Sequence, residues 1–123
     1  MNLRNRAQLI GNLGNNPVVK LFENGNKVAR FSLATSEVYK KGNKFVKDTQ
    51  WHIVVVWGKL ADMVERNLKI GSEVVVDGYI AQRSFVDKNG QKQYITEIIA
   101  NSLLCRSSEK QVIKSMSEVE KRA

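Results

Sequence analysis

Apolar and polar residues alternate along most of this chain with a period of two, which is typical of β-strands. In the first segment Ala7, Leu9 and Leu13 share one side, while polar residues occupy most of the other. Two turn signals, Asn24-Gly25 and Asn89-Gly90, predict hairpins. The whole pattern predicts strands over residues 3–13, 18–22, 27–37, 51–57, 74–85 and 93–104.

One segment departs from this period. Apolar residues at 60, 63, 64 and 68 recur with helical spacing, and Gly71 follows as a residue that ends helices, so we expect a short helix over 60–68. With the short strand at 18–22 left aside, three strands precede the helix and two follow it. This is the order of an all-β, five-stranded OB-fold Greek-key barrel with its helix between strands 3 and 4. The period alone also permits another small α+β fold.

The last residues differ in character from the rest. Ser108 and Gln111 can form a helix-capping box, and apolar residues at 112, 113, 116 and 119 make a helical stripe. A chain of 123 residues suits one compact domain rather than two. We therefore expect a barrel domain over residues 1–106 and a C-terminal helix or flexible tail over residues 107–123.

Two tryptophans bracket a β-branched run in the middle of the chain. Trp51 and Trp57 are six residues apart, so on a strand both indoles leave the same face. Ile53 and Val55 share that face and are ordinary core residues, so the residues themselves allow either a buried strand or a sheet that presents its rings to solvent. Exposed rings among cations are what single-stranded nucleic acid needs, because rings stack on bases and cations pair with phosphates.

The charge of the chain points toward a polyanion. Lysine and arginine outnumber aspartate and glutamate by 20 to 12, for a net charge of +8. An excess of this kind favours a nucleic acid over a membrane surface as partner. Four of the lysines and two aromatic residues lie within residues 39–47, a predicted loop or hairpin tip.

Enzymatic chemistry finds little support among the residues. His52 is the only histidine, and within an apolar strand a structural or interface role is expected for it. Asp77, Asp87 and Glu97 are separated along strands and turns, which argues against the clustered carboxylates of an OB-fold nuclease. We predict no catalytic residue, no metal site and no cofactor.

The expected setting is the cytoplasm. Cys105 is the only cysteine, so no internal disulfide can form, and its position at the end of an apolar run predicts a buried thiol. No stretch approaches the ~20 apolar residues of a membrane span. The first residues lack the apolar segment of a signal peptide.

Five segments of the chain resemble the bacterial single-stranded DNA-binding protein family, which is also found in phages, mobile elements and mitochondria. They occur in the family's order and cover residues 5–14, 31–37, 51–61, 69–72 together with 76–78, and 90–97. Each segment is short, but five in the right order are highly specific. The resemblance implies an OB barrel that assembles as a homotetramer and binds single-stranded DNA.

The resemblance also implies roles for individual residues. The family's stacking aromatics fall on Tyr39, Trp51, Trp57 and Phe85, which favours exposure of the two tryptophans, and His52 falls on a histidine associated with subunit contact. We expect phosphate contacts from the family's cationic positions and from the lysines of the 39–47 segment: Arg6, Lys20, Lys40, Lys41, Lys44, Lys47, Lys59 and Arg83.

The C-terminus departs from the family's pattern. Cellular members usually continue through a linker rich in Gly, Pro and Gln to an acidic tip that recruits replication and repair enzymes, and neither follows Arg106 in this sequence. Recruitment through such a tail is therefore not expected. We interpret the chain as a non-enzymatic, sequence-tolerant single-stranded DNA-binding protein that acts in replication, recombination, repair or DNA transfer; the alternative is an OB-fold adaptor whose aromatics serve protein contacts.

Overall fold

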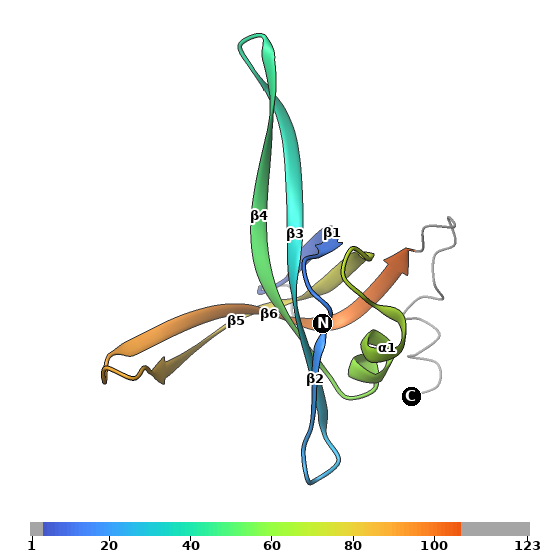
Figure 1. The fold of residues 1–123 in the computed structure, drawn as a ribbon, viewed down its shortest axis with the longest axis vertical. Helices are drawn as coiled ribbons and strands as arrows, with labels where there is room; N and C mark the ends of the chain where they lie inside the picture. Colours follow the sequence, from blue (N-terminus) through green and yellow to red (C-terminus); the bar gives the residue numbers. More distant parts are fainter. Residues whose placement is uncertain (1–3, 107–123) are drawn as a thin grey trace.

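The computed structural model describes residues 4–106, so the helix or tail expected at 107–123 lies outside the described residues. Within them, six strands and one helix follow one another along the chain (Figure 1). These are β1 (Ala7–Leu13), β2 (Val18–Leu21), β3 (Lys27–Lys41), β4 (Lys44–Trp57), α1 (Lys59–Asn67), β5 (Glu73–Val86) and β6 (Lys92–Arg106).

Five of the strands close into a barrel. They are hydrogen-bonded in the order β1-β5-β6-β4-β3, and β3 returns to β1 through the pairs Asn12–Ala34 and Leu13–Leu33. All neighbours in this ring are antiparallel except β4 and β6, which run parallel. Ring closure pairs the backbone groups that the edges of an open sheet would leave free. The predicted all-β OB barrel is therefore confirmed.

The predicted place of the helix is confirmed for the strands of the barrel, to which the structure adds one edge strand. Residues 18–21 pair with β3 as a separate edge strand, so four strands precede α1, and the helix lies between β4 and β5. Strand β2 adds to the edge of β3 and is not part of the closed ring. Among the five ring strands, α1 does lie between the third and the fourth. Its bounds agree with the predicted 60–68 to within one residue at each end.

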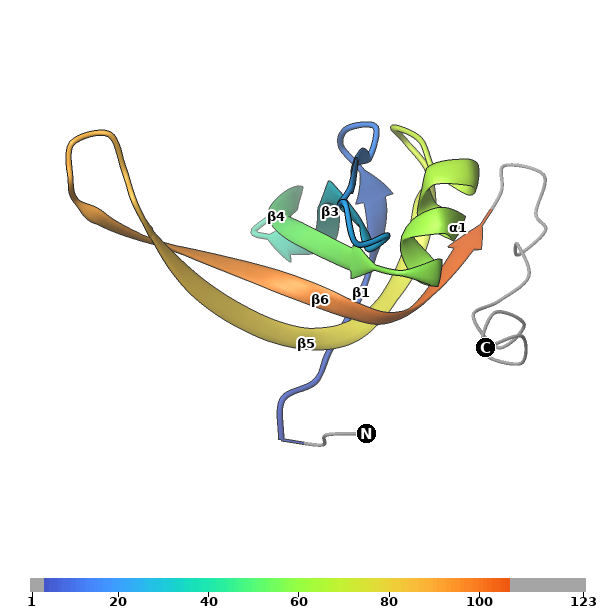
Figure 2. The same ribbon diagram turned by 90° about the horizontal axis from the view of Figure 1, so that it is seen from below.

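Two long hairpins extend from the barrel (Figures 1 and 2). Pairing of β3 with β4 continues to Lys41 and Lys44, so the segment at 39–47, predicted as a loop or hairpin tip, is the tip of a hairpin with a two-residue turn at Gly42-Asn43. Gly42 has a φ of +64°, which glycine adopts without strain, and tight turns of this kind keep both strands in register. Strands β5 and β6 form the second hairpin, which ends in the predicted turn after Val86.

Alternate residues of the ring strands fill the interior of the barrel. Leu33 of β3, Val54 and Val56 of β4, and Val76 of β5 have no exposed surface. Helix α1 contributes Ala61, Met63 and Val64 to the same core. Cys105 is buried, as predicted, and burial raises the pKa of its thiol. The inward-facing side chains of the ring strands are thus buried within one chain. The candidate functional residues therefore lie on the outward face.

Candidate nucleic-acid interface

Strand β4 presents both tryptophans on the outer face of the barrel. The side chains of Trp51 and Trp57 are 63% and 47% exposed. Continuous pairing with β3 places Ala34 opposite Trp51 and Val28 opposite Trp57, on the same face. The expectation that the rings reach solvent is confirmed. Val55, between them on this face, is nevertheless buried.

A second aromatic residue extends the platform at Trp57. The rings of Phe22 and Trp57 are stacked, with centroids 6.0 Å apart and planes 16° from parallel. The amino group of Lys20 lies over the ring of Phe22, with its Nζ 5.0 Å from the ring centroid. Pairing across β2, β3 and β4 aligns Lys20, Val28 and Trp57 in one row. Cation, ring and indole therefore form one continuous surface.

The other tryptophan packs on a glycine. A side chain at Gly14 would overlap the indole of Trp51, so only glycine lets the ring lie over the β1–β2 connection. Asn15 fixes that connection, since its Oδ1 accepts hydrogen bonds from the backbone N–H and the hydroxyl of Ser32, at 2.8 and 2.7 Å. Trp51 is thus held in place while most of its surface remains exposed.

A shallow, mostly apolar hollow of about 300 Å³ lies on this side of the barrel. Its floor and walls come from β3, β4 and the segment that enters β2. The lining residues are Asn15, Val18, Arg30, Phe31, Ser32 and Ile53. Ile53 belongs to the same outward row as the two tryptophans, so the hollow adjoins the aromatic platform.

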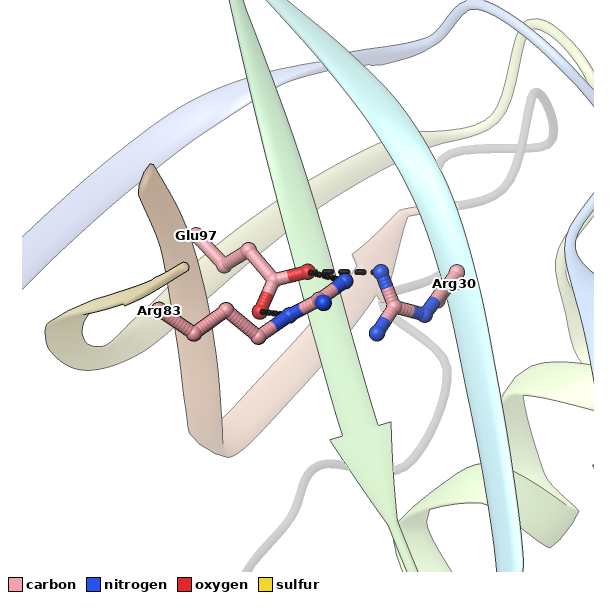
Figure 3. A network of polar contacts seen from close by, with 3 residues as sticks. All are labelled: Arg30, Arg83 and Glu97. Atoms are coloured by element: carbon pink, nitrogen blue, oxygen red, sulfur yellow. Dashed lines mark hydrogen bonds and ion pairs between the residues drawn. The ribbon is translucent and has the colours of Figure 1, made fainter. Parts of the chain in front are cut away.

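Strands β3, β5 and β6 together form a cationic cluster, the Arg30–Glu97–Arg83 triad (Figure 3). Glu97 Oε1 accepts a hydrogen bond from Arg83 Nε at 3.1 Å, and Glu97 Oε2 accepts one from Arg83 Nη2 at 3.3 Å and one from Arg30 Nη1 at 2.6 Å. Two residues beyond Arg83, on the same face of β5, lies the half-exposed ring of Phe85. The triad therefore connects Phe85 with the tryptophan face.

The carboxylate of the triad is ionised well below neutral pH. Burial by itself would raise the pKa of Glu97, but the hydrogen bonds and charges of Arg83 and Arg30 outweigh it, and the pKa lies below its ordinary value. A depressed pKa means that ionised Glu97 stabilises the fold above the ordinary pKa of about 4.3, and that this stabilisation is lost as the pH falls through the folded-state pKa.

The remaining predicted cations lie at three places. Arg6 is paired with Asp77 through Nε at 3.1 Å and Nη2 at 2.8 Å, and the hydrogen bond to this carboxylate raises the pKa of Arg6. The exposed lysines at the β3–β4 tip lie on both faces of that hairpin: Lys40 and Lys47 on the face of Trp51, and Lys41 and Lys44 on the opposite face. Lys59 is exposed at the start of α1, two residues after Trp57.

Tyr39 does not share the face of Trp51. It pairs with Val46 and lies five positions after Ala34, the partner of Trp51. Because this spacing is odd, its ring leaves the opposite side of the hairpin. The ring is 46% exposed there. Of the four predicted stacking residues, the structure brings together Trp51, Trp57 and Phe85 on one outer face and places Tyr39 behind it.

His52, Val54 and Val56 lie on the face of β4 opposite the tryptophans. Both valines are buried in the barrel of their own chain. His52 is half-buried, with its Nε2 2.9 Å from Thr35 Oγ1. The interface role of His52 therefore stays a prediction.

Sequence reasoning missed three residues of this surface, namely Phe22, Arg30 and Glu97. Phe22 directly follows the last residue of β2. It lies two positions after Lys20, so the two side chains would share one face of an extended segment, and this spacing is a signal for its place beside Trp57. Arg30 was visible as a charge between the apolar residues Ala29 and Phe31. No local signal marks Glu97, because its two partners lie 14 and 67 residues away.

Two further findings concern metal binding and membrane-spanning helices. Between residues 4 and 106, no three His, Cys, Asp or Glu side chains gather closely enough to hold a metal ion. In the same part of the chain, no helix has the length and apolar character required to cross a membrane.

An OB barrel that exposes aromatic rings and arginines on one face defines a nucleic-acid-binding OB domain. Residues 4–105 match the single-strand binding protein family, and the chain belongs to that family. It is 42% identical over 101 residues to single-stranded DNA-binding protein 1 of Chlorobaculum tepidum, which covers 80% of this chain and 62% of that relative's length. Identity is also 42% over 102 residues to single-stranded DNA-binding protein 1 of Xylella fastidiosa, with 80% and 74% covered.

A solved structure supports the same assignment. The Plasmodium falciparum SSB complex with ssDNA superposes on this chain with a TM-score of 0.77 at 34% sequence identity. The superposition covers 87% of this chain and 100% of the other. The chain spans less than two thirds of the Chlorobaculum relative, so that protein contains residues with no counterpart in the aligned region.

Proposed function

We propose that this protein binds single-stranded DNA with little sequence preference and protects unpaired strands during replication, recombination, repair or DNA transfer. The observation that carries the proposal is the exposure of Trp51, Trp57 and Phe85 on one outer face that also holds arginines. Bases within a duplex already stack on one another, so exposed rings select unpaired strands. Stacking tolerates any sequence, because every base has a π face.

The proposed path of the strand follows the outer face. One end is the surface formed by Lys20, Phe22 and Trp57. The middle is the hollow beside Trp51 and Ile53, and the other end is Phe85 on the β5–β6 hairpin. Arg6 and Lys59 provide charge beside this path. The basic tip of the β3–β4 hairpin and Tyr39 on its reverse side would contact DNA that passes around that hairpin.

Binding should quench the tryptophan fluorescence and should weaken steeply with salt. Titration with oligo(dT) at low salt is expected to quench both indoles, because stacked bases cover them. Raising the salt concentration should lower the logarithm of the affinity with a slope of roughly −0.7 per phosphate neutralised.

A matched duplex oligonucleotide serves as the control and should bind much more weakly at the same salt. Absence of quenching by oligo(dT) with a folded protein would refute the proposal. Affinity that does not change between low and moderate salt would contradict the phosphate contacts.

We also propose that the protein acts in the cytoplasm as a homo-oligomer, a tetramer being the state implied by the family resemblance. Support comes from apolar side chains that are exposed away from the tryptophan face, such as Ile10, which is 57% exposed on the outside of β1, and Ile80, which is 47% exposed. A second copy of the chain would bury such residues.

Mass measurement in solution tests this assembly. At micromolar concentration the mass should be a multiple of that of one chain, and His52→Ala should shift it toward smaller species if His52 lies in the interface. A strictly monomeric mass would contradict oligomerisation. An unchanged mass for His52→Ala would place the interface elsewhere.

A further inference from the structure

We infer that Glu97 is a positioning residue that holds Arg30 and Arg83 in place to receive one phosphate of the bound strand. This inference rests on the proposed function. It concerns a carboxylate within a surface that is meant to attract a polyanion, where a negative charge by itself opposes binding.

The geometry of the Arg30–Glu97–Arg83 triad supplies the first argument. Its members come from three strands, with Arg30 on β3, Arg83 on β5 and Glu97 on β6. Figure 3 shows the contact between Glu97 and Arg30 passing across β4, the strand that carries both tryptophans. The side chain of Glu97 is 4% exposed, whereas those of the arginines are 40% and 47% exposed. The carboxylate thus lies beneath the two guanidinium groups.

The hydrogen bonds leave donors free for a ligand. A guanidinium carries five N–H groups. Arg83 uses Nε and Nη2 toward Glu97, and Arg30 uses Nη1, so each arginine keeps further N–H groups. Two arginines and one carboxylate carry a net charge of +1, which matches the single negative charge of one phosphodiester. Guanidinium groups are suited to phosphate oxygens because their planar donors bind two oxygens at once.

The position of the triad relative to the rings supplies the second argument. Arg30 pairs with Val55, which lies in the row between Trp51 and Trp57. Arg83 lies two residues from Phe85 on the same face of β5. A phosphate held between the arginines would therefore join a nucleotide on the tryptophan side to one on the Phe85 side. Long arginine side chains lose conformational freedom on binding, and Glu97 removes much of that freedom before the strand arrives.

Replacing Glu97 distinguishes a positioning role of this residue from the electrostatic effect of its charge. Glu97→Gln removes one negative charge from the interface, so charge alone predicts tighter binding of oligo(dT). Positioning predicts weaker binding, by about three- to tenfold, because the arginines lose their anchor. A matched control is Glu73→Gln, which removes the same charge from a carboxylate paired with Arg106 at 3.1 Å, away from the tryptophan face. It should leave the affinity unchanged or slightly raised.

A second variant avoids the buried site in case Glu97→Gln does not fold. Arg83→Lys keeps the positive charge of a side chain that is 47% exposed, but lysine cannot bind both oxygens of Glu97. If Glu97 positions the arginines, Arg83→Lys should lose about as much affinity for oligo(dT) as Glu97→Gln. If only the charge of the side chain matters, Arg83→Lys should lose none. Arg106→Lys is its control. In the double variant Arg30→Ala/Arg83→Ala, adding Glu97→Gln should cause no further loss.

The outcomes separate the two hypotheses. Failure of the unmodified protein to bind oligo(dT) refutes the proposed function. Binding by the unmodified protein together with equal or tighter binding by Glu97→Gln, or with unchanged binding by Arg83→Lys, refutes the positioning role of Glu97 alone.

Discussion

Replacing Trp51 and Trp57 together by alanine should weaken the binding of oligo(dT) by at least about thirtyfold, because stacking on each ring contributes on the order of 1–3 kcal/mol. The two rings lie six residues apart on β4 and do not stack on each other, so their contributions should be close to additive. Both side chains are largely exposed, so the barrel should remain folded. The variant has no tryptophan left, so binding is measured by the fluorescence anisotropy of a labelled oligonucleotide.

The double variant Trp51→Phe/Trp57→Phe is the matched control. It keeps a ring at each position and should retain most of the affinity, whereas charge and backbone are the same in both variants. Circular dichroism should give the same melting temperature for both. If the alanine variant bound oligo(dT) as tightly as the unmodified protein, the aromatic face would not be the binding surface.

Gly11→Ala should destabilise the barrel by about 3 kcal/mol or more, because overpacking against a backbone that cannot move aside is costly. A Cβ at this position would overlap the carbonyl oxygen of Ala34 on β3. Asn12 and Leu13, next along the strand, form the two pairs that close the ring between β1 and β3. A side chain at Gly11 would therefore open the barrel at the seam between β1 and β3. The melting temperature should fall by roughly 10 °C or more.

Gln8→Ala tests whether the effect belongs to that seam. Gln8 is exposed on the same strand and pairs with Asp77 of β5, away from the contact with β3. Its replacement should change the melting temperature by no more than a degree or two, since exposed positions contribute about 0.5 kcal/mol or less. A stable Gly11→Ala variant would show that β1 and β3 can move apart without loss of the fold.

The sequence by itself determined the features that depend on neighbouring residues. Period-two alternation located the strands, and helical spacing located α1 to within one residue at each end. The same parity argument placed Trp51 and Trp57 on one face, and the Asn-Gly turns joined the hairpins. These predictions succeeded because a side chain's face follows from its position along its own strand or helix.

Tertiary structure decided what depends on pairing between distant strands. The strand predicted at 18–22 was placed at the edge of β3, outside the closed ring, and the 39–47 segment continued both strands of its hairpin up to the turn at Gly42-Asn43. Register also placed the ring of Tyr39 on the side of its hairpin opposite Trp51.

The composition of the interface shows the same division most clearly. The spacing of the tryptophans was readable in the chain, but the contact of Glu97 with Arg30 joins residues that are 67 positions apart. Which charges meet is set by barrel closure, which brings β3, β5 and β6 around β4, and no local pattern encodes that geometry. The sequence therefore determined the aromatic residues and the excess of positive charge, and the fold decided which arginines lie among the rings and which carboxylate holds them.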